Sequence, residues 1–332
     1  MTRPDAVDIH AHYFPEAFLD LCEREGGAAG VRVDRSDPKG PRLLGGGGRT
    51  PPLDATYWDL DRRVKYMDRR GVRVHALSLT SPMVYWADSD LGARLARAVN
   101  DAMEQAHRAY PERFVGCATL PMQDAKAALA ELERVTALRG IRGVYLGTNI
   151  AGRDLSDPAF RPLFARCQAA RLPVLLHPLT VIGAPRLQPY YLSNLLGNPF
   201  DTAVAAAHFV FGGILDEFPR LEVCLPHAGG ALPALFGRLG HGQRVRPEAR
   251  TPRKPFAAYL RRFTYDTISH SPQVLAYLVS LVGADRIMVG SDHCFDMGYQ
   301  RPREVVTRGM RLRRADQARV LHGTASRLLR LT

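Results

Sequence analysis

The chain has 332 residues, of which 46% are hydrophobic and 23% are charged, a balance that allows one large buried core. Its net charge of +12 comes almost wholly from arginine, because only four lysines occur, and the arginines form no basic stretch interleaved with aromatic residues, which argues against nucleic-acid binding. No run of about 18 apolar residues occurs either, which argues against a membrane-spanning protein.

Short apolar runs rich in β-branched residues alternate along the chain with longer stretches of helical periodicity. The predicted strands are 6–12, 72–79, 113–120, 143–148, 173–178, 221–228, 262–267 and 286–292. Between them, stretches such as 59–71 and 124–140 place apolar residues at helical spacing. Eight strand–helix units predict an α/β fold of the (β/α)8 TIM-barrel type. An open doubly wound sheet is less favoured, because it would carry a glycine-rich phosphate turn after its first strand.

Two segments interrupt this alternation. Residues 27–57 are rich in glycine and proline and predict a small insertion between the first strand and its following helix. Residues 179–200 form a second long connection, after the fifth predicted strand. Loops that follow barrel strands lie over the active-site face. Nothing in the composition indicates a linker, so we expect a single domain over 1–332.

The first candidates for chemistry are His10 and His12, at the end of the first predicted strand. Two-residue spacing along a strand points both side chains to the same face, where two imidazoles can bind one metal ion. His177, His227 and Asp292 end the fifth, sixth and eighth predicted strands. Each could by itself be a capped strand end or a buried histidine. Five such residues at the rim where barrels bind their substrates instead predict a metal centre.

Imidazoles with one carboxylate suit Zn²⁺, with Mn²⁺ or Fe²⁺ as alternatives, and they leave a coordination position for water. We expect His10, His12, His177 and Asp292 to hold one divalent ion, because no lysine lies on a predicted strand to bridge a second one. Such an ion acidifies its bound water. His227 is the expected general base, and Asp292 could also carry a proton.

Two arginines are candidates for holding an anionic substrate. Arg49 follows the GGGG run at 45–48 and would reach the rim from the insertion, and Arg238 follows His227 by eleven residues. Either arginine could instead be a solvated surface residue.

The cysteines and the amino-terminal sequence bear on the compartment. The five cysteines are odd in number and widely spaced, which predicts free thiols rather than a disulfide framework. The first residues lack the apolar core of a secretory signal. We therefore expect a cytoplasmic protein.

The candidate residues lie within longer stretches, including DIHAHYFP, WDLDRRVKYMDRRGVRVHALS, FGGILDEFPRLEVCLPHAGGALP and VGSDHCFDMG. In this order they resemble the amidohydrolase superfamily, and within it the decarboxylases typified by aminocarboxymuconate-semialdehyde decarboxylase. The resemblance covers the whole chain. It implies one Zn²⁺ or Mn²⁺ at the four ligands, a catalytic His227 and no organic cofactor. It also implies a homodimer in which Arg238 enters the neighbouring subunit's site and holds the substrate carboxylate together with Arg49.

The implied reaction is the metal-dependent, non-oxidative loss of CO₂ from a small unsaturated or phenolic acid. The chain departs from the aminocarboxymuconate enzyme after His177, where HPLT and YYLSNLLGNP replace an aspartate and a tryptophan expected near the substrate. The resemblance therefore predicts the reaction class rather than the substrate. One alternative is a hydrolase or hydratase of the same superfamily, acting on a lactone, an ester or a C–C bond. A second alternative is a binding protein built on a retired enzyme barrel.

Overall fold

The computed structural model describes residues 5–46 and 48–331, so residues 1–4, 47 and 332 of the predicted domain lie outside the described residues. Its centre is a seven-stranded parallel sheet in the order β1-β5-β6-β7-β10-β11-β12. Nearly every residue of these strands is buried, as expected for a parallel sheet covered by helices. The strands are β1 (Ala6–His12), β5 (Val72–Ser78), β6 (Phe114–Thr119), β7 (Ile141–Gly147), β10 (Val174–His177), β11 (Val223–Leu225) and β12 (Phe263–Tyr265).

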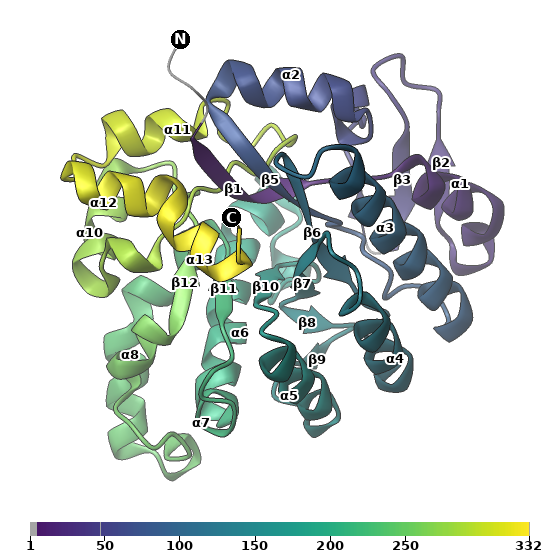
Figure 1. Ribbon diagram of the computed structural model, residues 1–332. Coiled ribbons are helices and arrows are strands. Elements are labelled where there is room, and N and C mark those ends of the chain that lie inside the picture. Colours follow the sequence, from purple (N-terminus) through teal and green to yellow (C-terminus); the bar gives the residue numbers. More distant parts are fainter. Residues whose placement is uncertain (1–4, 47, 332) are drawn as a thin grey trace.

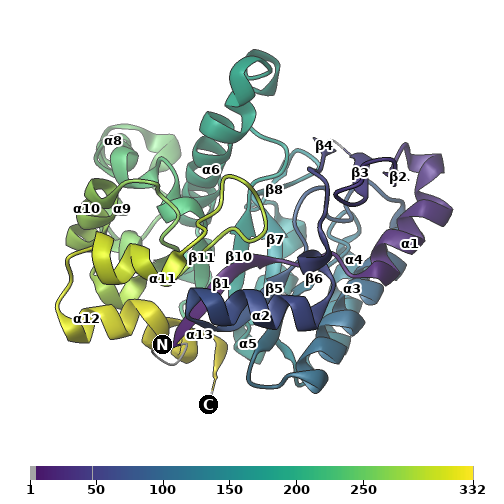
Figure 2. The ribbon, with the colours of Figure 1, turned by 90° about the horizontal axis from the view of Figure 1, so that it is seen from above.

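Helices connect consecutive strands of this sheet and surround it, as Figure 1 and Figure 2 show from two directions. The helices are α1 (Glu16–Glu25), α2 (Leu60–Arg70), α3 (Ser89–Ala109), α4 (Ala125–Val135), α5 (Arg161–Ala170), α6 (Asn198–Phe211), α7 (Ile214–Glu217), α8 (Leu232–Val245), α9 (Phe256–Tyr259), α10 (Pro272–Val282), α11 (Pro302–Glu304), α12 (Arg314–Ala318) and α13 (Thr324–Leu329). The alternation of strand and helix confirms the α/β class and the predicted positions of seven strands.

The segment predicted as an eighth strand, 286–292, forms no regular strand. It makes isolated parallel bridges on both sides, from Ile287 to Tyr265 of β12 and from Val289 to Asp8 of β1. The segment therefore lies between the two edge strands of the sheet. One reason for its irregularity is that the backbone N–H of Ser291 donates to the carboxylate of Asp8 (3.1 Å) rather than to a strand carbonyl.

Part of the glycine-rich segment 27–57 forms an antiparallel sheet of β2 (Arg32–Asp34), β3 (Arg42–Gly45) and β4 (Gly48–Arg49). In the chain this sheet precedes α2, the helix predicted over 59–71, and it follows α1, a helix that was not predicted from the sequence. The helix α1 forms there because Phe18, Leu19, Leu21 and Cys22 bury one face of the segment.

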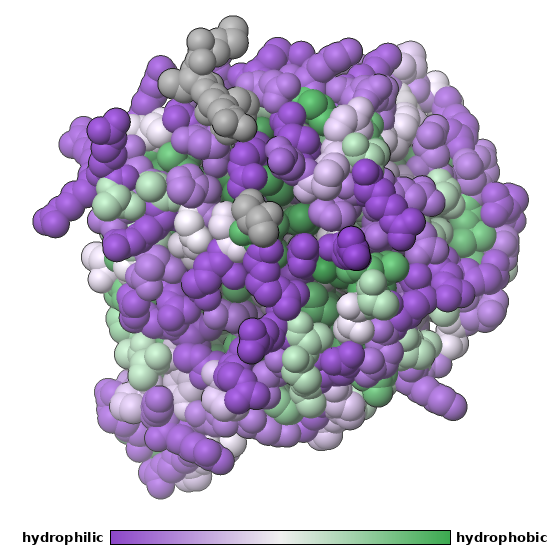
Figure 3. All heavy atoms as spheres, in the orientation of Figure 1, coloured by the Kyte–Doolittle hydropathy of each residue, from purple (hydrophilic) through white to green (hydrophobic). Residues whose placement is uncertain are grey.

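The positive charge is spread over the surface, where part of it is paired with carboxylates. Arg94, for example, lies within 3.0 Å of both Glu25 and Asp90, and Arg134 pairs with Glu131 and Asp101. The face in Figure 3 is mostly hydrophilic, with small apolar areas between the polar side chains. This distribution is that of a solvated surface.

Two further expectations from the sequence concern the cysteines and membrane-spanning segments. All five cysteines are free, and four of them are buried, as the spacing predicted. Within the described residues, the structure contains no helix with the length and apolarity that a bilayer crossing requires.

Candidate metal centre

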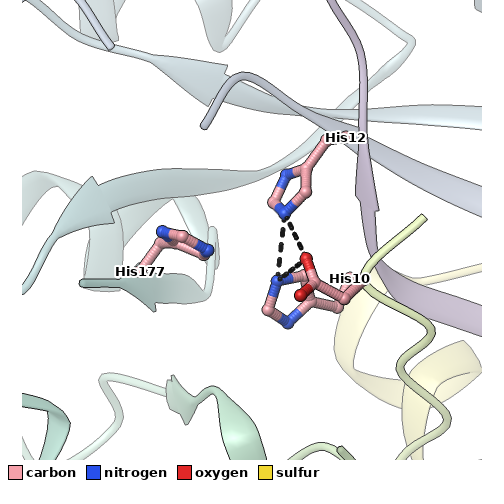
Figure 4. A group of neighbouring side chains, drawn as sticks. His10, His12 and His177 are labelled. Carbon is pink, nitrogen blue, oxygen red and sulfur yellow. Dashed lines mark hydrogen bonds and ion pairs between the residues drawn. The ribbon is translucent and has the colours of Figure 1, made fainter. Parts of the chain in front are cut away.

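Four predicted ligands meet at the carboxyl ends of the sheet strands. His10 and His12 come from β1, His177 ends β10, and Asp292 follows the segment that bridges the sheet edges. One donor atom from each residue lies within 4.8 Å of the others. Figure 4 shows the rings of His10, His12 and His177 directed towards a common space. The structure therefore brings together residues that are 282 positions apart in the sequence.

The distances within this cluster are short. The Nε2 atoms of His10 and His12 are 3.2 Å apart, and the Oδ1 atom of Asp292 lies 2.9 Å from Nε2 of His12 and 3.5 Å from Nε2 of His10. All four side chains are buried. Three imidazole nitrogens and one carboxylate oxygen at this spacing form a donor set that suits a divalent transition-metal ion.

The outward nitrogens of the three imidazoles have partners that fix the rings. Nδ1 of His10 lies 2.8 Å from a carboxylate oxygen of Asp266, and Nδ1 of His177 lies 2.8 Å from the carbonyl oxygen of Pro178. Nδ1 of His12 lies 3.2 Å from the hydroxyl of Ser78. Because these oxygens can accept hydrogen bonds, each ring can carry its hydrogen on Nδ1 and direct the Nε2 lone pair inwards, as metal-binding histidines do.

The electrostatics favour neutral rings at His12 and His177 facing an ionised carboxylate at Asp292. Burial lowers the pKa of His12 to about 4, and burial together with the neighbouring histidines lowers the pKa of His177 well below its ordinary value. Burial alone would raise the pKa of Asp292, but its hydrogen bond with His12 and the charge of His10 lower it below the ordinary range. His12, His177 and Asp292 are thus in the protonation states that a metal ion requires. Burial would lower the pKa of His10 as well, but its hydrogen bond with Asp266 and the charge of Asp292 raise it.

Asp266 is the residue that the sequence reasoning missed. It lies just beyond β12, is fully buried, and contacts Nδ1 of His10. It also accepts hydrogen bonds from the backbone N–H groups of His227 (3.0 Å), Ala228 (2.8 Å) and Ile268 (2.9 Å). One carboxylate thus orients a ligand ring and the turn that carries His227. The sequence carried one signal for Asp266, because this residue lies near the end of a predicted strand, as the other site residues do.

A second buried group holds the end of β1. The guanidinium of Arg63, on α2, donates to the carbonyl oxygens of His12 (2.7 Å) and Thr56 (3.1 Å). The carboxylate of Asp8 accepts from the backbone N–H of His10 (3.1 Å). Since Arg63 and Asp8 are fully buried, these bonds form away from water and fix the backbone of both histidines.

The cluster opens into a cavity of about 430 Å³. His177, Asp292, His227 and Arg49 all line it. Arg238 lies exposed on α8 and is absent from the lining of this cavity within the described residues. The structure therefore brings one of the two predicted arginines to the site of its own chain.

His227 faces the same cavity without belonging to the ligand cluster. Its ring centre lies 5.3 Å from that of His10 and 5.7 Å from that of His177, and its Nδ1 atom is buried without a hydrogen-bond partner among the described residues. Burial and the charge of His10 lower its pKa below the ordinary value. A neutral imidazole with an unengaged nitrogen is a suitable proton acceptor.

The long connection 179–200 contributes the outer wall of the cavity, as predicted. Val181, Tyr191, Asn194 and Asn198 line it. In Figure 2 this segment and α6 project on the side of the molecule away from the C-terminus. Its base is tied down by the buried Asp201, which accepts from the backbone N–H of Ile182 (3.2 Å).

Comparison with known proteins shows one family over nearly the whole chain. The model of the family described as Amidohydrolase matches residues 7–331. The 2-amino-3-carboxymuconate-6-semialdehyde decarboxylase of Dictyostelium discoideum is 30% identical over 328 residues, which cover 98% of this chain and 91% of that protein.

Solved structures agree with the fold. The 5-carboxyvanillate decarboxylase from Sphingomonas paucimobilis matches with a TM-score of 0.85 and 25% identity, over 99% of this chain and 100% of that one. The dihydroxybenzoic acid decarboxylase from Polaromonas sp. JS666, with bound manganese and the inhibitor 2-nitroresorcinol, matches with a TM-score of 0.80 and 24% identity, over 98% and 97% of the two chains.

The contact between Asp266 and His10 leads to a prediction about metal affinity. In Asp266→Asn the Nδ1–H group of His10 loses its charged hydrogen-bond acceptor. The other ring nitrogen then becomes a weaker electron-pair donor to a metal ion, so we expect the affinity for Zn²⁺ to fall about 10- to 100-fold. Titration of the metal-free protein against a competing chelator measures this. The partly exposed Asp285 provides a matched control, because Asp285→Asn removes surface ion pairs with Arg261 and Arg286 and lies outside the cluster. Unchanged affinity in a folded Asp266→Asn protein would contradict the assigned role.

Proposed function

The chain belongs to the amidohydrolase family, and we propose that it is a metal-dependent decarboxylase of small aromatic or unsaturated carboxylic acids. The observation that carries this proposal is the complete set of His10, His12, His177 and Asp292 around one point, beside the unengaged ring of His227. A 30% identical relative over nearly the whole chain is named as a decarboxylase. The 25% identical structure is that of an aromatic-acid decarboxylase.

We propose one Zn²⁺ at the four ligands, since three imidazoles with one carboxylate suit that ion. Mn²⁺ is the alternative, because the Polaromonas structure holds manganese, and elemental analysis of the purified protein distinguishes the two. A divalent ion bound there would supply Lewis acidity for a substrate oxygen or a water molecule.

The protein residues would handle the proton that decarboxylation requires. When the bond to the carboxylate breaks and CO₂ leaves, the electron pair stays on the substrate carbon, and that carbon must take up one proton. His227 is neutral at neutral pH because its pKa is lowered, so it can accept a proton from water or a substrate hydroxyl and deliver it to this carbon. An unsaturated or phenolic acid is required because its π system can hold the electron pair.

Arg49 supports an anionic substrate, since it lines the cavity beside the cluster. We propose that Arg238 completes the site from a neighbouring subunit of a homodimer. Its exposed position on α8, outside the cavity of its own chain, is compatible with that role.

We also propose that segment 286–292 closes the sheet as an irregular eighth strand of a (β/α)8 barrel, with 1–332 as one domain. The bridges of this segment to both β12 and β1 support closure. One continuous core cluster that extends from Ala6 to Leu329 supports a single domain.

The test of the function is the fate of the carboxylate. Hydroxybenzoates and unsaturated acids, incubated with the metal-loaded protein in ¹⁸O water, should release CO₂ and leave products that lack the carboxyl group. Release of CO₂ requires carbon–carbon lyase chemistry. Incorporation of ¹⁸O without CO₂ would instead establish the hydrolase or hydratase alternative. A purified protein without stoichiometric metal would favour the second alternative, a binding protein on a barrel that has lost its enzymatic activity.

The role of His227 predicts a specific pH dependence. The base must be neutral, and its pKa lies below the ordinary 6.5, so kcat/KM should stay high at neutral pH and fall only as the pH drops through that lowered pKa. His227→Asn should lower kcat about 10²- to 10⁴-fold and remove this acidic limb while keeping the metal. His177→Ala should lose metal and activity together. His208→Asn, at a partly exposed histidine paired with Asp154, serves as the control, and full activity of His227→Asn would refute the assignment.

The proposed contribution of Arg238 across an interface predicts complementation. His227→Ala and Arg238→Ala should each be inactive alone. In a hybrid dimer one site combines an intact His227 with an intact Arg238 from the partner, so an equal mixture of co-expressed subunits should regain about a quarter of wild-type activity. If Arg238 acted within its own chain, no hybrid site would be complete and activity would stay absent.

A further inference from the structure

A second, smaller cavity adjoins the site cavity. Its volume is about 140 Å³, and its walls include Pro82, Tyr85 and Trp86. It shares Ser81, Leu179 and Thr180 with the site cavity. These three residues therefore lie at the boundary between the two cavities, and we call them the neck of the side cavity.

The neck lies directly beside a proposed metal ligand. Gly147, at the end of β7, is the register partner of His177 on β10. A Cβ atom at Gly147 would lie 2.9 Å from the side chain of Leu179 and 3.0 Å from that of Tyr85, so both side chains pack tightly over this strand end. A substrate whose reacting carbon faces His177 and His227 would thus have its far edge within reach of the side cavity.

The aromatic walls of the side cavity have little unused hydrogen-bonding capacity. The indole N–H of Trp86 donates to the carbonyl oxygen of Met83 (2.9 Å), and the hydroxyl of Tyr85 accepts from the backbone N–H of Gly147 (3.1 Å). The polar ends of both side chains are therefore engaged within the chain. What they offer to a ligand is ring surface, which favours apolar groups.

The glycine-rich segment forms one wall of the side cavity by close backbone approach. A Cβ atom at Gly46 would lie 2.9 Å from Cδ1 of Trp86 and 3.0 Å from Cβ of Pro82, and the φ angle of this residue is +62°. A larger residue would displace the tryptophan ring or strain the backbone. Close packing against Trp86 and Pro82 therefore explains why position 46, in the GGGG run at 45–48, is a glycine.

We infer that the side cavity between Pro82, Tyr85 and Trp86 is a substrate subsite that takes an apolar substituent of the acid. The inference rests on the proposed decarboxylase function and names its substrate class, which is an aromatic or unsaturated acid carrying an alkyl or small aryl group. A cavity of about 150 Å³ is sufficient for a benzene molecule, so the subsite accepts groups from methyl up to about that size. Charged substituents are disfavoured, because the polar residues of the described lining, Ser81, Asn149 and Thr180, carry no charge that would offset the lost water.

The first test compares hydroxybenzoates with and without a methyl, ethyl or propyl group at each ring position. For the position that enters the subsite, kcat/KM should rise about fourfold per buried methylene and stop rising once the cavity is full. In Trp86→Ala the ratio of kcat/KM for the ethyl-substituted acid to that for its parent should fall about threefold or more, because one wall is lost. The inference would be overturned if kcat/KM of the wild type were the same for all members of the alkyl series. It would also be overturned if the ratio of kcat/KM for the ethyl-substituted acid to that for its parent were unchanged in folded, metal-loaded Trp86→Ala.

The second test measures binding without turnover and uses the two tryptophans of the chain. Trp58 packs against the core and is absent from the described linings of both cavities, so Trp58→Phe serves as the control variant and should keep the wild-type ratio. In this variant Trp86 is the sole tryptophan. Its emission should be quenched by an ethyl-substituted 2-nitrophenol at a concentration on the order of tenfold lower than by 2-nitrophenol itself.

The two tests separate this inference from the function on which it rests. If no acid loses CO₂ but Trp86 still reports tighter binding of the ethyl-substituted probe, the decarboxylase proposal fails and the subsite stands. If acids lose CO₂ with equal kcat/KM whatever their substituent, the function stands and the subsite is refuted.

Discussion

The constraint on which the site depends is the burial of three imidazoles and one carboxylate at a single point. Two imidazole nitrogens 3.2 Å apart cannot both carry a proton without repulsion in a medium of low polarity. The cluster is stable when the rings are neutral and each outward nitrogen has a partner. The carboxylate of Asp266, 2.8 Å from Nδ1 of His10, meets that condition for the His10 ring and also fixes the turn that carries His227. A metal ion would satisfy the remaining inward lone pairs.

The parallel sheet makes this crowding possible because the carboxyl ends of its strands share one rim. His10 and Asp292 come from opposite ends of the chain and meet only because segment 286–292 bridges the two sheet edges. The irregularity of that segment is part of the arrangement, since Asp292 has a φ of 59°, which no regular strand allows. The guanidinium of Arg63 fixes the end of β1 through its hydrogen bond to the carbonyl oxygen of His12. The ligand positions therefore follow from how the sheet closes.

Reaction chemistry and substrate selection reside in different parts of the molecule. Strand ends hold the proposed ligands and His227, whereas the antiparallel sheet with Arg49 and the connection 179–200 line the site cavity, and Trp86 lines the side cavity proposed as a subsite. Loops can change without disturbing a buried sheet. This division explains why family resemblance predicts the reaction class, while the departures at 179–200 leave the substrate to the shape of the cavity.

The sequence alone determined the α/β class, seven of the strands and the four residues of the cluster, because apolar periodicity and two-residue spacing are local properties of strands. It did not distinguish Asp266 from other residues near strand ends, and it gave no indication that 286–292 departs from a strand. Both depend on contacts between segments distant in the chain, Asp266 with His10 and Ser291 with Asp8. Trp86 likewise reaches the side cavity only through the tertiary structure. Local pattern decided which residues reach the rim, and tertiary structure decided which of them meet there, since that depends on how the sheet edges come together.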